Sequence, residues 1–141
     1  MTDVSDAPGC PFCTRIRGHK GLLATRRTAV ALPDAFPVNP GHCLILPKRH
    51  EPDYFELTVE EQADITDLLW ELRELLEAEH HTRAFNVGVN VGSVAGQTVD
   101  HAHVHLIPRF EGDVPDPRGG VRCVIPERAR YPLLDSPTDG G

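Results

Sequence analysis

Between residues 101 and 107, histidines alternate strictly with apolar residues, in the order His101-Ala-His103-Val-His105-Leu-Ile. Successive side chains of a β-strand point to opposite faces of a sheet, so this period of two predicts a strand that buries Ala102, Val104 and Leu106 in a core. The three imidazoles then share the other face, with neighbouring Cα atoms about 6.5 Å apart. The fold must therefore contain a sheet that is covered on one side of this strand.

Three further segments favour strands. Residues 28–32 and 42–46 are short β-prone runs, and the sequence Pro37-Val-Asn-Pro-Gly41 between them is typical of a turn. In residues 85–91, apolar side chains alternate with Asn and Gly, which predicts a strand buried on one side. After the histidine run the chain is rich in Pro and Gly, and only residues 121–125 are a candidate for another short strand.

The strongest helix signal runs from Thr58 to about Glu79. It opens with Thr58-Val-Glu-Glu61, a capping box in which the two outer side chains satisfy each other's backbone amides. Trp70 lies off the apolar stripe of this helix, either as a single exposed side chain or as an anchor for a partner subunit. The stripe, which should pack on a sheet, consists of Ile65, Leu68, Leu69, Leu72, Leu75 and Leu76.

The length of 141 residues predicts one domain with one core, because domains typically have about 50 to 200 residues. Within residues 1–141 we distinguish a Cys-containing arm (10–20), a core (21–110) and a Pro/Gly-rich tail (111–141) whose end is expected to be mobile. In the arm, the segment Thr14-Arg-Ile-Arg that follows the two cysteines predicts a short N-terminal helical turn.

The formal net charge of −7 argues against a broad surface for nucleic-acid polymers, which requires clustered Lys and Arg. A small phosphorylated ligand needs only a few donors in one pocket, so it remains compatible with this charge. No segment approaches the ~20 consecutive apolar residues that cross a membrane, and the acidic start Met1-Thr-Asp-Val-Ser-Asp differs from an export signal. These features predict a cytoplasmic protein that does not contact a membrane.

The histidine face has chemistry suited to phosphorus. Neutral imidazole is a nucleophile near pH 7, and a nucleotidylated histidine is a high-energy intermediate that water can discharge. Flanking imidazoles can donate hydrogen bonds to phosphate oxygens. Two other interpretations stay open: ordinary exposed strand positions, and a catalytic metal site in which two of the histidines share a Zn²⁺ with a third ligand.

These residues resemble the histidine triad (HIT) family, in which His and apolar residues alternate as they do here. The segment Pro40-Gly-His42-Cys-Leu-Ile-Leu-Pro-Lys-Arg-His50 resembles the part of the family that carries a fourth active-site histidine, and Gly96-Gln97-Thr98-Val99-Asp100-His101 resembles its phosphate-contacting loop. The resemblance covers most of residues 10–110. It implies an α+β fold, in which an antiparallel sheet of about five strands carries one long helix packed on it, and it implies pairing of two subunits into a homodimer.

The resemblance also implies a function: hydrolysis or nucleotidyl transfer at the α-phosphate of a dinucleoside polyphosphate or nucleoside phosphoramidate. His103 would be the nucleophile that carries the nucleotidyl group, supported by His42 and His105. The purine nucleotide would be held by Asp34, Asn90, Gln97, Thr98 and His105, with Asp34 at the ribose. For Asp34 a turn-initiating role, and for Asn90 a satisfied amide at a strand end, are alternatives. A purine-nucleotide-binding signalling module with little turnover is the alternative function.

The pair Cys10-Pro-Phe-Cys13 is half of a zinc site by its spacing. A redox pair or unliganded thiols are the alternatives, although a redox pair usually opens a helix in a βαβ unit that is missing here. Bacterial branches of the HIT family and the related galactose-1-phosphate uridylyltransferases look similar in this segment, and the resemblance implies that His50 and His101 complete the set. A Cys₂His₂ set has no open position, so the Zn²⁺ would be structural.

Overall fold

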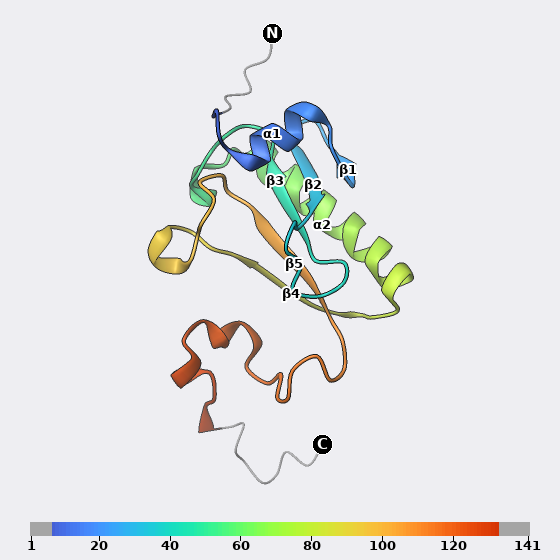
Figure 1. The fold of residues 1–141 in the computed structure, drawn as a ribbon, viewed down its shortest axis with the longest axis vertical. Helices are drawn as coiled ribbons and strands as arrows, with labels where there is room; N and C mark the ends of the chain where they lie inside the picture. Colours follow the sequence, from blue (N-terminus) through green and yellow to red (C-terminus); the bar gives the residue numbers. More distant parts are fainter. Residues whose placement is uncertain (1–6, 133–141) are drawn as a thin grey trace. The chain divides into compact units, whose positions relative to one another are not determined.

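Five antiparallel strands form one sheet in the order β1-β2-β3-β5-β4 (Figure 1). This computed structural model describes residues 7–132, so the predicted mobile end of the tail at residues 133–141 lies outside the described residues. The strands are β1 (Ala24–Thr25), β2 (Ala29–Pro33), β3 (Cys43–Pro47), β4 (Ala84–Val89) and β5 (Val104–Arg109). With one long helix packed on the sheet, the predicted α+β fold is confirmed.

The long helix α2 spans Val59–His80, and the predicted capping box between Thr58 and Glu61 is present. Its buried line follows Ile65, Leu68, Leu72 and Leu76, packed mainly on β2 and β3. Leu75 was expected in this line but is 50% exposed. The buried line steps from Leu72 to Leu76, which leaves Leu75 on the flank of the helix, away from the sheet.

The two faces of the sheet carry different helices. On one face, α2 packs against side chains that include Ala31, Ile45 and Val104. On the other face, the short helix α1 (Pro11–Gly18), which confirms the predicted N-terminal helical turn, brings Phe12 against Leu32 and other side chains of β2 and β3. Because Ala102, Val104 and Leu106 face α2, the alternating histidines face the side of α1.

Strand β5 begins at Val104, so the prediction that the strand starts at His101 was wrong. The ladder with β3 runs from Cys43 paired with Leu106 to Ile45 paired with Val104, and His101 lies beyond it. The backbone there is held by other bonds: the amide of Ala102 donates to the carbonyl of Glu51 at 2.7 Å. The alternation nevertheless continues, because Ala102 is fully buried on the α2 side.

Strand β4 forms an edge of the sheet, next to β5 only. Phe85 and Val89 pack on the core, but Val87 between them is 45% exposed. The prediction that this face is buried therefore holds only in part. The physical reason is that α2 lies mainly over β2 and β3 and leaves β4 with little cover.

By its internal contacts the chain divides into two compact units between Arg109 and Phe110. The assignment of residues 1–141 to a single domain stays a prediction. In the second unit, residues 121–125 were expected as a strand, but Gly120–Val124 is the 3-10 helix η3. Gly119 before it and Gly120 at its start have positive φ, Pro126 follows it, and its amides bond locally, so the segment turns instead of extending.

Three more 3-10 helices complete the described chain: η1 (Tyr54–Glu56), η2 (Ser93–Ala95) and η4 (Pro126–Arg128). In the second unit, Asp116 binds both Arg118 and Arg130, and the guanidinium of Arg122 lies over the ring of Tyr131. Among residues 7–132, every helix is too short or too polar to cross a membrane.

Candidate active site

The ring of His103 is held in one tautomer. Its Nδ1 lies 2.7 Å from the backbone oxygen of His101. A carbonyl oxygen only accepts, so Nδ1 must donate, and in a neutral imidazole the other nitrogen then carries the lone pair. The edge of the Phe12 ring packs against His103, with 5.0 Å between ring centroids, and His103 is only 7% exposed. The geometry therefore presents Nε2 of His103 as a fixed nucleophile.

A chain of hydrogen bonds that passes through His42 orients the ring of His105. The backbone amide of Val38 donates to Nδ1 of His42 at 3.1 Å, which requires that Nε2 of His42 carries the proton. That Nε2 lies 2.9 Å from Nδ1 of His105 and 3.3 Å from a carboxylate oxygen of Asp34. When His42 donates to His105, the Nε2 of His105 is left with its proton as a donor. The His105 ring lies 5.1 Å from the His103 ring.

Both supporting imidazoles are neutral near pH 7. Burial lowers the pKa of His42, against the opposing effect of the Asp34 carboxylate. Burial also lowers the pKa of His105, and the neighbouring His103 and His42 lower it further because they would be like charges. The neutral forms are the ones that can both accept and donate in the chain of bonds described above.

The four predicted zinc ligands come together from three distant segments. Nδ1 of His101 lies 3.6 Å from the sulfur of Cys10 and 3.6 Å from the sulfur of Cys13, whose sulfur is 3.3 Å from Nδ1 of His50. All four ligand atoms lie within 4.8 Å of one another. Around a tetrahedral Zn²⁺, sulfur and nitrogen ligands are about 3.6 Å apart, so the distances fit this metal.

The tautomer and the neutral form of the His101 ring also suit a metal ligand. Its Nε2 lies 2.8 Å from the carbonyl oxygen of Pro47 and must donate to it, which leaves the Nδ1 lone pair facing the two sulfurs. Burial lowers the pKa of His101 to about 4, so the ring stays neutral at physiological pH. The side chain is fully buried. The Cys₂His₂ donor set is thus chemically ready for Zn²⁺.

A second group of possible ligands is less suited to a metal than the Cys₂His₂ set. Asp34, His42 and His105 also place ligand atoms within 4.8 Å of one another. However, the Val38 amide uses the Nδ1 lone pair of His42, so its Nε2 bears a proton and has no lone pair for a metal. The bonds within this trio favour a hydrogen-bonded relay.

Two of the candidate nucleotide contacts, Asp34 and Asn90, directly follow strands β2 and β4, and Thr98 lies in the loop before the histidine run. Asp34 follows β2; one carboxylate oxygen accepts from the amide of Phe36 at 2.8 Å and the other faces His42, so the predicted turn role and a second role coexist. Asn90 follows β4 and is half-buried beside Gly96, and Thr98 is exposed. Contacts of these side chains with a nucleotide stay predictions.

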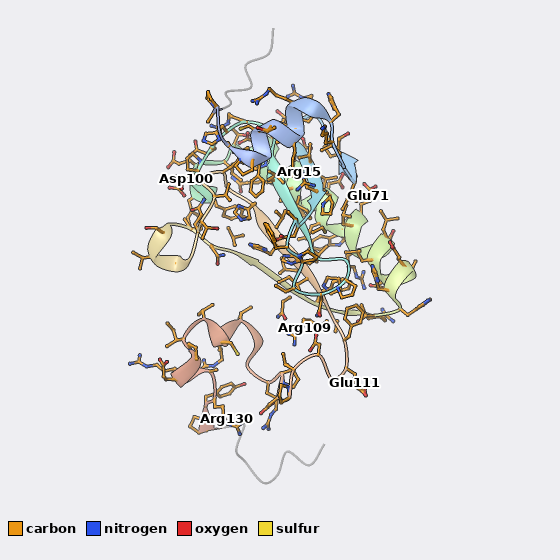
Figure 2. The ribbon with its side chains drawn as sticks, in the orientation of Figure 1. Arg15, Glu71, Asp100, Arg109, Glu111 and Arg130 are labelled. Atoms are coloured by element: carbon orange, nitrogen blue, oxygen red, sulfur yellow. The ribbon has the colours of Figure 1, made fainter. Side chains whose placement is uncertain are left out.

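Gln97 differs from the other candidates because its amide is used within the loop. Its oxygen accepts from the amide of Gly92 at 2.8 Å, and its nitrogen donates to the carbonyls of Pro52 and Val99. The side chain is 9% exposed. In this position Gln97 braces the loop that leads through Asp100 (labelled in Figure 2) into the histidine run; a contact with phosphate stays a prediction.

Several functional groups gave no signal in the sequence. The Val38 amide and the carbonyls of Pro47 and His101 are backbone atoms, which every residue has, so no residue type marks them. Phe12 packs on His101 and His103, and its place between the two cysteines was the only available signal.

Comparisons with known proteins agree with this geometry. The HIT domain family model matches residues 19–112. AP-4-A phosphorylase of Mycobacterium tuberculosis is 32% identical over 77% of the chain, which spans 58% of the length of that enzyme. Adenosine 5'-monophosphoramidase of Schizosaccharomyces pombe is 35% identical, over 71% of this chain and 74% of that one.

Among solved structures, a zinc-bound histidine triad family protein from Mycobacterium smegmatis superposes with a TM-score of 0.68 at 26% identity, covering 82% of this chain and 90% of that one. The match of the family model to about two thirds of the chain and the agreement of the fold lead to one conclusion. The chain belongs to the HIT domain family.

Proposed function

We propose that the protein is a nucleotide hydrolase or nucleotidyl transferase that cleaves at the α-phosphate through a nucleotidyl intermediate on His103. The observation that carries the proposal is the 2.7 Å bond from Nδ1 of His103 to the His101 carbonyl, because it frees Nε2 for attack. The named activities of two relatives, an AP-4-A phosphorylase and an adenosine 5'-monophosphoramidase, support this class of substrate. The substrate is a dinucleoside polyphosphate or a nucleoside phosphoramidate, with a purine base.

In the first step, the Nε2 lone pair of His103 forms a bond to the α-phosphorus, and the bond from phosphorus to the leaving group breaks. The leaving group takes that electron pair; an amine also takes a proton from solvent. The His103 ring becomes a cation, which the bond from Nδ1 to the His101 carbonyl stabilises. Water then attacks phosphorus, the electron pair returns to Nε2, and the proton of the water passes to solvent.

The remaining predicted residues have supporting roles. The Nε2–H of His105 donates to a phosphate oxygen as charge develops, held in that tautomer by His42. Asp34 binds the ribose hydroxyls, and Asn90 and Thr98, together with Gln97, lie along the phosphates.

The zinc ligands are Cys10, Cys13, His50 and His101. A bound Zn²⁺ supplies folding energy in this closed set and has no open position for a substrate. The zinc-bound structure from M. smegmatis supports the assignment. The alternative, a zinc-dependent hydrolase, requires an open position that four protein ligands do not leave.

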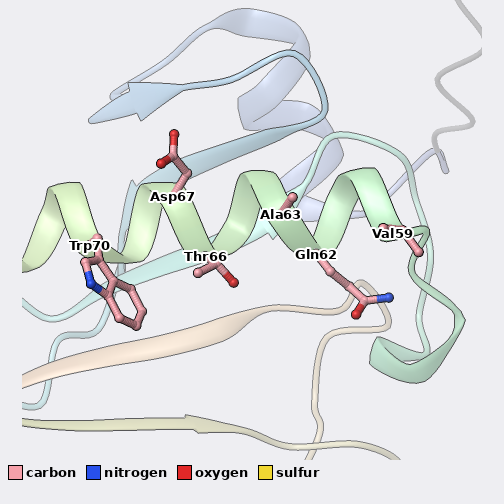
Figure 3. A pocket seen from close by; sticks show the side chains of 6 residues that line it. All are labelled: Val59, Gln62, Ala63, Thr66, Asp67 and Trp70. Carbon is pink, nitrogen blue, oxygen red and sulfur yellow. The ribbon is translucent and has the colours of Figure 1, made fainter.

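We also propose that the protein is a cytoplasmic homodimer. The edge strand β4 exposes unpaired backbone groups and Val87. The exposed side of α2 carries a shallow groove lined by Val59, Ala63 and Trp70 among others (Figure 3), and Trp70 is 64% exposed. Gln62, Thr66 and Asp67 complete the lining of this groove. An exposed tryptophan bordered by polar side chains is typical of a subunit interface, so we assign Trp70 as the anchor.

A substrate panel tests the function. The protein is incubated with diadenosine polyphosphates, adenosine phosphoramidate and the corresponding guanosine compounds, and mass spectrometry of the quenched mixture seeks a nucleotidyl adduct on His103. We expect turnover, and we expect His103→Ala to abolish both turnover and adduct while it still binds AMP. If the wild-type protein binds AMP but turns over none of these compounds, the signalling-module alternative is favoured instead.

A further inference from the structure

An ion pair connects the long helix α2 to the segment that carries His50. It belongs neither to the Cys₂His₂ set nor to the group of His42, His103 and His105. Arg49 precedes the zinc ligand His50 and forms a two-bond pair with Glu61, in which Nε donates to one carboxylate oxygen at 3.0 Å and Nη2 donates to the other at 2.9 Å. The Glu61 side chain is 5% exposed, so its carboxylate is shielded from water, while the Arg49 side chain is partly exposed. Charge-assisted bonds of this bidentate kind fix both distance and orientation.

Glu61 is itself fixed in place. It is the fourth residue of the capping box, and its carboxylate accepts from the Thr58 amide at 2.9 Å. Because the first turn of α2 is held by this box, Arg49 is fastened to a rigid element rather than to a loop. The same guanidinium donates to a carboxylate oxygen of Glu51 at 3.1 Å, whose other oxygen accepts from the amide of Asp53.

The segment held by Arg49 contacts the histidine run directly. The carbonyl of Glu51 accepts from the amide of Ala102, the residue between zinc ligand His101 and nucleophile His103. One residue earlier, Nδ1 of His50 lies 3.3 Å from the sulfur of Cys13. A displacement of residues 49–51 would therefore move a metal ligand and release the backbone bond between the two histidines.

We infer that Arg49 and Glu61 are positioning residues that hold His50 in the metal set and the His101–His103 segment in register. The inference rests on the zinc assignment of the proposed function, but it is separate from the identity of the substrate. Its measurable consequence lies first in metal affinity and only then in turnover.

The test uses Arg49→Ala with a matched control, Arg26→Ala. Arg26 pairs with Asp67 and Glu71 of the same helix and is equally exposed, at 30% against 31% for Arg49. It bonds to these two carboxylates and to the carbonyl of Thr25, none of which belongs to a zinc ligand. Zinc affinity is measured by competition with a chromogenic chelator, and the Co²⁺-loaded proteins are compared by visible absorption, which reports tetrahedral thiolate coordination. Thermal unfolding of each variant is recorded alongside.

We expect Arg49→Ala to weaken zinc binding about tenfold and to alter the Co²⁺ spectrum, because groups that orient metal ligands typically contribute 10–100-fold to affinity. Arg26→Ala should lose stability without either change. Arg49→Lys, which keeps the charge but not the two-bond geometry, should fall between wild type and Arg49→Ala, and it keeps the test usable if the alanine variant fails to fold.

The inference is overturned if Arg49→Ala, or Arg49→Lys where only that variant folds, binds zinc as tightly as the wild type with an unchanged Co²⁺ spectrum. It is also overturned if Arg26→Ala weakens zinc equally, since the effect would then reflect general stability, or if the wild-type protein binds no zinc. Tight zinc binding by a wild-type protein that turns over no nucleotide would sink the proposed function and leave this inference intact.

Discussion

Lowering the pH should destabilise the zinc-free protein through one buried imidazole, that of His101. Burial lowers its pKa from 6.5 to about 4. The folded state therefore favours the neutral ring, whereas the unfolded chain takes up the proton at its ordinary pKa. The resulting stability is fully present above pH 6.5, is lost progressively as the pH falls toward 4, and has no further pH dependence below that value.

The size of the effect follows from the separation of the two pKa values. A difference between 6.5 and about 4 corresponds to about 3 kcal/mol, of which about 2 kcal/mol is lost between pH 7 and pH 5. Solvent does not screen the His101 ring, which is 0% exposed, so the whole pKa difference contributes to the free energy of unfolding. Burial of His42 and His105 adds to the loss in the same direction, since the pKa of each is also lowered.

The measurement is urea unfolding of the metal-free protein at pH 7, 6 and 5, for the wild type and His101→Gln. The glutamine cannot take up a proton in this range, so we expect its stability to fall by about 2 kcal/mol less than that of the wild type between pH 7 and 5. His19→Asn serves as the control, because His19 is exposed and Asn tolerates its left-handed backbone. Equal pH slopes in the wild type and His101→Gln would refute the reasoning, as would an NMR titration that places the pKa of His101 near 6.5.

Three other substitutions give direct tests. Phe12→Ala should lower the free energy of unfolding by about 3–5 kcal/mol, measured by urea unfolding, because it empties a buried site against His103; an effect below ~1 kcal/mol would show that α1 does not pack there. Val38→Pro removes the amide that binds His42 and should cost about 1 kcal/mol more than Val38→Ala, which keeps that amide; equal unfolding curves would contradict the proposed relay. Trp70→Lys should convert the proposed dimer to monomer in light scattering at micromolar concentration, whereas a wild-type protein that is already monomeric would exclude the dimer.

Local sequence signals predicted the elements whose bonding partners are close in sequence, and those in which a periodic pattern continues over many residues. The capping box located the start of α2, because both of its bonding partners lie within four residues. The alternation of residues 101–107 predicted which side chains face the core, since Ala102 and Val104 had to be buried together. Leu75 shows the limit of periodicity: an apolar residue near the stripe stays exposed where the sheet does not reach it.

Two elements differ from what the propensity of their side chains indicates. Strand β1 has only two residues, and it exists because Ala24 and Thr25 pair with Ala31 and Val30. Conversely, residues 121–125 have a composition that favours a strand, but glycines with positive φ and a following proline direct the chain into η3. Pairing with β2 thus creates a strand that propensity alone does not indicate, and local glycine and proline geometry prevents one that propensity favours.

The same distinction applies to the site. The spacing of Cys10 and Cys13 predicted half of a zinc site, and the resemblance to the HIT family implied that His50 and His101 complete it. The structure places the four ligand atoms within one cluster. The tautomers of His103 and His105 were not predictable, because the backbone groups that set them belong to no particular residue type. The placement of Gln97 as a brace likewise follows from three backbone partners that only the folded loop brings together.

His101 links the two clusters, and this link predicts how turnover depends on the metal. Its ring faces the sulfurs of Cys10 and Cys13, while its carbonyl accepts from Nδ1 of His103. A metal in the Cys₂His₂ set would thus affect His103 by fixing the His101 backbone rather than by activating water, because no coordination position is open.

Turnover should then be nearly independent of which tetrahedral metal is bound. We expect Zn²⁺-, Co²⁺- and Cd²⁺-loaded proteins to have kcat values within about threefold of one another, since each metal can hold the same S₂N₂ set. The metal-free protein should have a lower kcat, with KM changed less, because the nucleophile loses its orientation while the nucleotide contacts remain. A catalytic metal would behave differently: kcat would change strongly with the metal, since each metal lowers the pKa of bound water to a different extent, and that result would replace the structural role with the metal-dependent alternative.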